Sequence, residues 1–184
     1  MSFDLLRCFP DEIQPSAFQV VSLATRDEPV NARPIAELFV GGETLMYPSR
    51  LYMEARQLND AVVEWSGLRR QLALCLGTRH HDGYLRESCL RRLGMPDAKW
   101  KIPFVSLLLG DYVVEISSLA ASLLAAAPRG MVAEFAAKNP GVMRTLRRRA
   151  ISYWDCYYRD LYATYKVIPA VTIIDELEVA KNAL

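Results

Sequence analysis

Two apolar repeats separated by a short polar turn constrain the fold of this chain more than any other feature. They lie in residues 67–94, whose sequence is GLRRQLALCLGTRHHDGYLRESCLRRLG. The apolar side chains of the first repeat fall on one stripe of an α-helix: Leu68, Leu72, Cys75 and Leu76. Those of the second repeat recur every fourth residue: Leu85, Cys89 and Leu93. This spacing predicts two amphipathic helices, over about 67–77 and 82–93.

The start of the second helix carries a recognisable polar pattern. Asp82 stands where an N-cap is expected, and its carboxylate can accept the free backbone N–H groups of the first turn. With Leu85 and Arg86 it forms an Asp-x-x-Leu-Arg sequence. This helix–turn–helix unit resembles a HEAT-type α-helical repeat. The resemblance covers about 28 residues and implies a helical scaffold whose surface binds a macromolecule.

Proline and glycine divide the rest of the chain into short segments. Further helices are predicted over about 11–25, 34–40, 54–65, 102–127, 130–138 and 141–165. A loop or brief extended piece follows Gly41-Gly42, and a strand-like piece is expected after residue 167. The sequence therefore predicts an all-α fold of seven to eight helices. Its form is a compact α-α helical bundle or a short, irregular HEAT-like stack.

The length of 184 residues predicts one domain, 1–184, with a core that needs no disulfide or metal. Within it we expect an irregular, proline-rich part over 1–50, a helical core over 51–166 and a tail over 167–184. The four cysteines show no CxxC spacing, which predicts reduced, packed thiols. The first residues do not have the pattern of a signal peptide, so a cytoplasmic protein is expected.

The segment 102–127 is apolar and long enough to cross a bilayer. However, Asp111 and Glu115 lie near its middle, and each would cost a few kcal/mol in lipid. We interpret the segment as a buried helix, and no membrane partner is predicted. Being four residues apart, the two carboxylates would share a face.

Buried carboxylates need a partner, and Arg79, Arg86 and Arg147 are the candidates. The preferred interpretation is a set of structural ion pairs. The residues assigned to it are Asp82, Arg86, Asp111 and Glu115.

The chain's two histidines, His80 and His81, stand beside Asp82 in the predicted turn. Such a cluster can bind a metal or act as a base. Adjacent side chains diverge, however, and no HExxH spacing completes a site. We favour a polar turn that caps the next helix, and we predict no metal and no cofactor.

The predicted helix over 141–165 combines arginines with aromatic residues. Its aromatic and apolar stripe comprises Tyr153, Trp154, Tyr157, Tyr158, Leu161, Tyr162 and Tyr165. One polar face is expected to hold Arg148, Asp155, Arg159 and Lys166. Arginine and aromatic side chains dominate protein–protein hot spots, and they also bind phosphates and bases. The residues predicted to bind a partner are Arg147, Arg148, Trp154, Tyr158 and Arg159.

The first functional hypothesis is a non-enzymatic interaction or scaffold protein that binds a protein partner or a second copy of itself. The second is a nucleic-acid-binding helical-repeat module, against which the net charge of only +1 argues. The third is a metal-dependent enzyme. It would use His80, His81, Asp111 and Glu115. The chain contains no P-loop, GxGxxG or GxSxG motif, which weakens the case for an enzyme.

Overall fold

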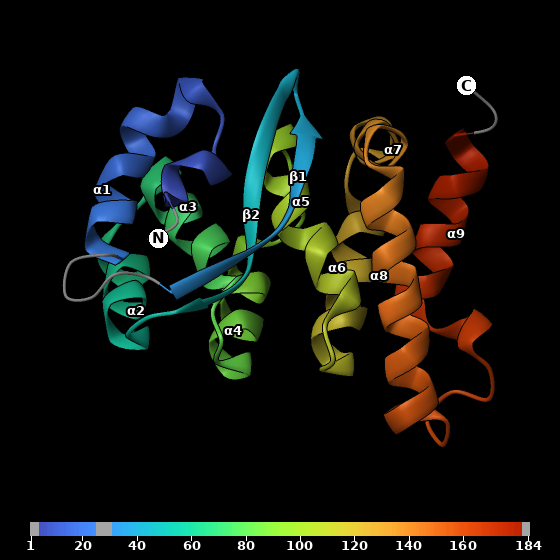
Figure 1. Ribbon diagram of the computed structural model, residues 1–184. Coiled ribbons are helices and arrows are strands. Elements are labelled where there is room, and N and C mark those ends of the chain that lie inside the picture. Colours follow the sequence, from blue (N-terminus) through green and yellow to red (C-terminus); the bar gives the residue numbers. More distant parts are fainter. Residues whose placement is uncertain (1–3, 25–30, 182–184) are drawn as a thin grey trace. The chain divides into compact units, whose positions relative to one another are not determined.

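A computed structural model describes residues 4–24 and 31–181. In these residues it contains nine α-helices, several shorter helical turns and one two-stranded sheet, so the all-α prediction is confirmed. The Cα positions divide the chain into two compact units, Met1–Leu93 and Gly94–Leu184. Figure 1 draws unit 1 in blue to green and unit 2 in yellow-green to red. Whether 1–184 behaves as a single domain stays a prediction.

Unit 1 is built around helix α3. Its elements are the 3₁₀-helices Leu5–Cys8 and Asp11–Ile13, α1 (Gln14–Ala24), β1 (Asn31–Val40), β2 (Glu43–Tyr52), α2 (Ala55–Glu64), α3 (Gly67–Gly77) and α4 (Gly83–Leu93). Helix α3 contacts α1, α2 and α4, and the side chains from Leu72 to Leu76 are all buried. The predicted helix pair is therefore confirmed.

The helix predicted over 34–40 is wrong, because these residues lie in strand β1. β1 pairs with β2 in an antiparallel hairpin, with Val40 opposite Glu43. The two residues between them, Gly41 and Gly42, have φ angles of 61° and 101°. A two-residue turn of this kind requires positive φ and joins antiparallel strands. The extended piece expected after these glycines is confirmed as β2.

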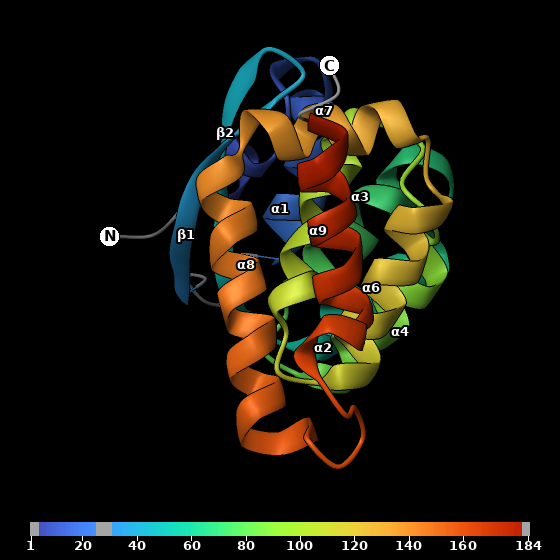
Figure 2. The same cartoon turned by 90° about the vertical axis from the view of Figure 1, so that its right-hand side faces the viewer.

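Unit 2 is built around its last helix, α9. Its elements are the 3₁₀-helix Lys99–Lys101, α5 (Ile102–Ser106), the 3₁₀-helix Leu107–Gly110, α6 (Val114–Ala126), α7 (Arg129–Lys138), α8 (Pro140–Tyr153), a π-helical turn (Trp154–Tyr158), the 3₁₀-helix Tyr165–Val167 and α9 (Pro169–Lys181). Helix α9 contacts α6, α7 and α8 and buries Val171, Ile174 and Leu177. Figure 2 shows α9 running beside these helices.

The single helix predicted over 102–127 is wrong, since the chain leaves helical geometry at Asp111. Asp111 is extended, with φ −75° and ψ 145°, and its carboxylate accepts the N–H of Val113 at 3.1 Å. Gly110 lies so close to α8 that an added Cβ would stand 2.9 Å from the Leu146 side chain. Asp111 and Glu115 thus do not share a helix face, and Glu115 is exposed.

No single helix among the described residues is both long and apolar enough to span a membrane. Helices α6 and α7 reach that length only together, and the chain bends by 117° between them.

The helix predicted over 141–165 ends early, and the strand-like tail is helical. α8 gives way to the π-helical turn at Trp154, and Lys166 lies beyond both, in the 3₁₀-helix. Lys166 therefore does not share a helix face with Arg148, contrary to the prediction. Pro169 begins α9, where its fixed φ and missing N–H are tolerated. In Figure 2 the connection from α8 to α9 projects from the end of α8 and turns back.

Candidate interaction surface

Helix α8 presents a basic face to solvent. Pro140 begins the helix, while Met143, Leu146 and Ala150 are buried on its inner side. Arg144 and Arg148 lie one turn apart on the outer side, and both are exposed. Neither forms an ion pair with any of the residues in 4–24 and 31–181; Arg148 reaches only the Thr145 hydroxyl, at 3.4 Å. This face therefore carries uncompensated positive charge.

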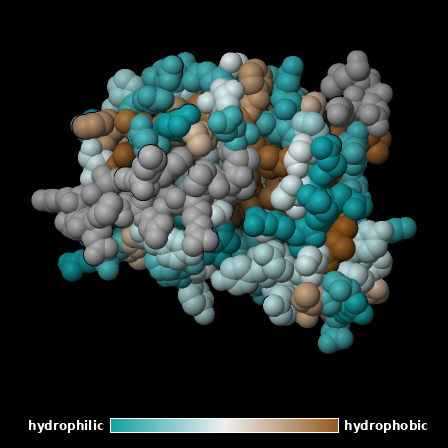
Figure 3. Space-filling view, viewed as in Figure 1, coloured by the Kyte–Doolittle hydropathy of each residue, from teal (hydrophilic) through white to brown (hydrophobic). Residues whose placement is uncertain are grey.

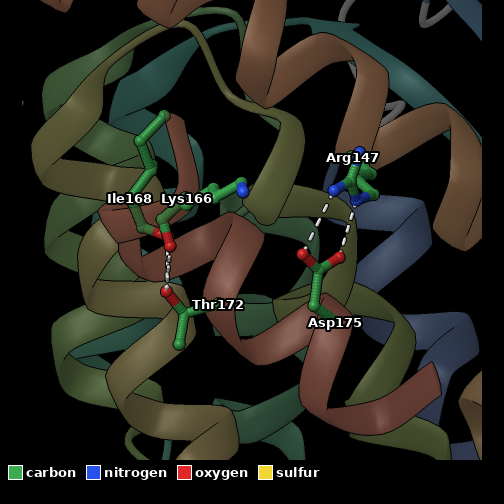
Figure 4. Close-up of polar contacts among 5 residues, drawn as sticks. All are labelled: Arg147, Lys166, Ile168, Thr172 and Asp175. Carbon is green, nitrogen blue, oxygen red and sulfur yellow. Dashed lines mark hydrogen bonds and ion pairs between the residues drawn. The ribbon is translucent and has the colours of Figure 1, made fainter. Parts of the chain in front are cut away.

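Arg147 instead joins α8 to α9. Its Nε and Nη2 atoms donate to the two carboxylate oxygens of Asp175 at 2.6 and 3.1 Å, as Figure 4 shows. Its guanidinium carbon lies 5.8 Å from the centre of the Tyr165 ring. The paired carboxylate raises the pKa of Arg147 above its ordinary value. Arg147 was one of three candidate partners for Asp111 and Glu115, and it pairs with Asp175 instead.

The start of α9 is fixed by Thr172. Figure 4 shows its hydroxyl directed at the carbonyl oxygens of Ile168 and Lys166, at 3.1 and 3.3 Å. The preceding 3₁₀-helix is capped by Thr164, whose hydroxyl accepts the N–H of Lys166 at 3.4 Å. Local side-chain hydrogen bonds thus stabilise the connection between α8 and α9.

Residues 153–167, here called the aromatic end, combine fixed backbone with exposed apolar side chains. Trp154 Nε1 donates to the Tyr162 carbonyl at 2.8 Å, and Tyr158 donates its hydroxyl to the Tyr112 carbonyl at 2.6 Å. Tyr157 and Leu161 nevertheless remain 70% and 60% exposed. Burial of the Tyr158 phenol raises its pKa.

Arg159 also belongs to the aromatic end. Its guanidinium pairs with the Asp155 carboxylate, and its central carbon lies 5.6 Å from the centre of the Trp154 ring. The five predicted partner-binding residues therefore all lie on α8 and the turn that follows it. Arg148 and Arg159 are exposed, and the Arg148 side chain makes a hydrogen bond only to the Thr145 hydroxyl among the described residues.

Sequence reasoning overlooked two features of this surface. It assigned most of the aromatic stripe to core or interface and did not single out Tyr157 and Leu161, which are both exposed. It also missed Asp175, because the tail was interpreted as a strand. The DELE sequence at 175–178, next to an apolar run with helical spacing, is the signal that could have located α9 and its acids.

The histidine turn in unit 1 is a structural element. Asp82 accepts the N–H of Tyr84 at 2.8 Å, which confirms its capping role. The His80 and His81 rings lie 4.3 Å apart, so the expectation that they diverge is wrong. His80 donates from Nε2 to the Met53 carbonyl at 2.9 Å and accepts the Asp82 N–H at Nδ1 at 3.0 Å.

These contacts use both nitrogens of His80, and burial lowers its pKa. His81 uses Nδ1 to donate to the Leu51 carbonyl at 3.2 Å. The buried Arg86 guanidinium donates to the carbonyls of both histidines, at 3.0 and 2.8 Å. Among the residues that the structure describes, no group of three or more His, Cys, Asp or Glu side chains could hold a metal ion.

The cysteines are separate free thiols. Cys8, Cys75 and Cys89 are buried, while Cys156 is exposed in the π-helical turn, contrary to the expectation that all four are packed. Burial raises the pKa of the Cys89 thiol to about 12, so it stays protonated at neutral pH.

Comparison of the chain with known protein families, curated proteins and solved structures finds no match.

Proposed function

We propose that this chain is a non-enzymatic interaction protein and that the aromatic end of unit 2 contacts a protein partner. The observation that carries the proposal is the exposure of Tyr157 and Leu161, at 70% and 60%, on a backbone fixed by side-chain hydrogen bonds. Large apolar side chains that stand exposed together mark interaction sites more often than isolated ones.

The fixed backbone supports the proposal energetically. Binding is weakened by the entropy lost when loops and side chains become ordered. The bonds made by Trp154 and Tyr158 order this segment before any partner arrives. Tyrosine, tryptophan and arginine are the residue types most often found at hot spots, and Arg159 supplies an exposed guanidinium group beside the Trp154 ring.

The observed contacts favour a protein-binding function over the other two hypotheses, nucleic-acid binding and metal-dependent catalysis. The charge of Arg159 is compensated by Asp155, and the acid Asp160 follows directly, which weakens attraction for a phosphate backbone. In Figure 3 the surface over α8 and α9 has brown, apolar areas among teal, polar ones. Both His80 nitrogens are used in hydrogen bonds, which weakens the metal-enzyme hypothesis.

A pull-down from source-cell lysate, with and without nuclease, tests the proposal. We expect a protein partner to be retained in stoichiometric amount with and without nuclease. Its binding should be lost with Tyr157→Asp and with Leu161→Asp and should persist with Tyr84→Asp. Tyr84 is the matched control because it is 87% exposed on α4 in unit 1. The free energy of unfolding of each of the three variants should lie within about 0.5 kcal/mol of the native value.

The proposal fails if the Tyr157 and Tyr84 variants behave alike, or if no stoichiometric protein is retained. Nucleic acid in the eluate, with a steep loss of binding as salt rises, would support the nucleic-acid alternative instead.

A further inference from the structure

A second surface of unit 2 lies between α8 and α9. The α8–α9 hollow is an open depression of about 690 Å³, lined by Arg144, Arg147, Arg148, Asp175, Glu178 and Val179. Beside it lies an apolar cavity of about 60 Å³. The apolar residues around this cavity are Ala136, Pro140, Met143, Ile174 and Leu177, and Arg144, Arg147 and Glu178 also line it. A water-sized group needs about 10–15 Å³ of such space, so the three carbons of a valine side chain fit.

The charges around the hollow are arranged in two rows. On α8, Arg144 and Arg148 stand one turn apart without an ion pair among the described residues. Asp175 already neutralises Arg147. On α9, the exposed Glu178 supplies the opposite charge. A complementary helix must therefore present two acids one turn apart, an apolar side chain and a base.

Helix α2 of this same chain has that pattern on its exposed face. Arg56, Asp60 and Glu64 follow one another at four-residue steps, and Val63 lies on the same side at 100° per residue. Arg56 and Asp60 are 87% and 61% exposed, and their mutual distance of 3.8 Å makes only a weak pair. Val63 is 72% exposed and provides the apolar side chain on this face.

We propose that the α8–α9 hollow binds helix α2 of a second copy of the chain. Val63 enters the apolar cavity over Met143, Ile174 and Leu177. Asp60 and Glu64 pair with Arg144 and Arg148, because both pairs are separated by one helical turn. Arg56 then faces Glu178 of the partner copy's α9, which carries the opposite charge.

This interface joins two different surfaces, so each copy can offer one and accept the other. Such a head-to-tail contact closes into a ring or continues as a chain of copies. Nucleic acid suits the hollow less well, because Asp175 and Glu178 repel phosphate and a phosphate backbone leaves the apolar cavity unfilled. The inference goes beyond the proposed function and does not involve the aromatic end, so Tyr157→Asp should leave self-association unchanged.

Sedimentation velocity of the full chain, from about 10 µM to 1 mM, tests the inference. We expect the weight-average mass to rise above 20.8 kDa with concentration and to fall toward that value as salt screens the ion pairs. Val63→Asp should abolish the rise. Its control is Tyr84→Asp, because Tyr84 is 87% exposed on α4 and belongs neither to α2 nor to the hollow. A mass of 20.8 kDa at every concentration overturns the inference.

Charge reversal identifies the surfaces. We use two double variants: one carries Asp60→Arg and Glu64→Arg, and the other carries Arg144→Glu and Arg148→Glu. Each should stay monomeric, because like charges then face each other. Mixing the two variants should restore association, since the native α2 of one meets the native hollow of the other. The four substituted residues are exposed, so thermal unfolding should not change. Association of either variant alone, or none in the mixture, overturns the inference.

Discussion

At the scale of single residues, Arg147 connects three segments of unit 2. It starts on α8, pairs with Asp175 on α9 and lies over Tyr165 in the connection between them. The two-atom pairing with a carboxylate is stronger and more directional than a lysine could provide. Arg147 therefore helps to hold the position of α9 against α8, which in turn shapes the hollow.

A double-mutant cycle with Arg147→Gln and Asp175→Asn measures this contact. Because the two side chains are 33% and 43% exposed, solvent screens the pair, and we expect a coupling free energy of about 0.5–1 kcal/mol. Urea denaturation of the four proteins gives the value. Arg148→Gln is the control, and it should change stability by less than about 0.5 kcal/mol because Arg148 has no acidic partner in the described residues. Equal effects of the Arg147 and Arg148 substitutions would contradict the assignment.

The sequence predicted individual polar residues where their role is local. Asp82 was identified as a cap because capping depends only on its position before an apolar repeat. The partner of Arg147 could not be found in this way, since Asp175 lies 28 residues further along the chain and on a helix that the sequence did not reveal. Ion pairs depend on which elements pack together, and residue spacing alone does not contain that information.

At the scale of elements, the β1–β2 hairpin depends on its two turn glycines. Gly41 and Gly42 have positive φ, where a residue with a side chain is strained. We expect Gly42→Val to lower the free energy of unfolding by about 1–2 kcal/mol, because a β-branched residue is disfavoured at φ 101°. Chemical denaturation is the measurement.

Gly130→Ala supplies the matched control for this hairpin. Gly130 lies in α7, has no atom within 4 Å of an added Cβ and does not have positive φ. We expect alanine there to raise stability by about 0.5–1 kcal/mol through its better helix propensity. No loss of stability with Gly42→Val would show that the turn geometry does not limit the stability of unit 1, and a loss with Gly130→Ala would contradict the expected gain in helix propensity.

Helices were predictable where their apolar spacing was complete, as in α3 and α4. The errors fall where a local signal has two meanings. Gly41-Gly42 was taken to end a helix, although two glycines between apolar runs also favour a hairpin turn. Pro169 lies in the piece expected to be strand-like, although proline also begins helices, as it does in α9. The helix breaks at Asp111 next to the close approach of α8 to Gly110, a tertiary contact that residue spacing does not reveal.

At the scale of the whole molecule, the two units have separate central helices, α3 in unit 1 and α9 in unit 2. Leu76 is fully buried in α3, and Ile174 is 3% exposed in α9. Replacing either side chain by alanine removes buried apolar atoms and leaves a cavity, which lowers the free energy of unfolding by about 2–5 kcal/mol. The division of the Cα positions predicts that each cost falls mainly on the unit that contains the substitution.

Amide hydrogen exchange on Leu76→Ala and Ile174→Ala tests this expectation. Amides that open only through local unfolding report the stability of their own cooperative region. We expect Leu76→Ala to speed exchange in α3 and α4 by at least about thirtyfold, the equivalent of 2 kcal/mol, with a smaller effect in α9. Ile174→Ala should give the reverse pattern. Equal acceleration in both units would mean that residues 1–184 unfold as one cooperative domain, as the length of the chain predicts.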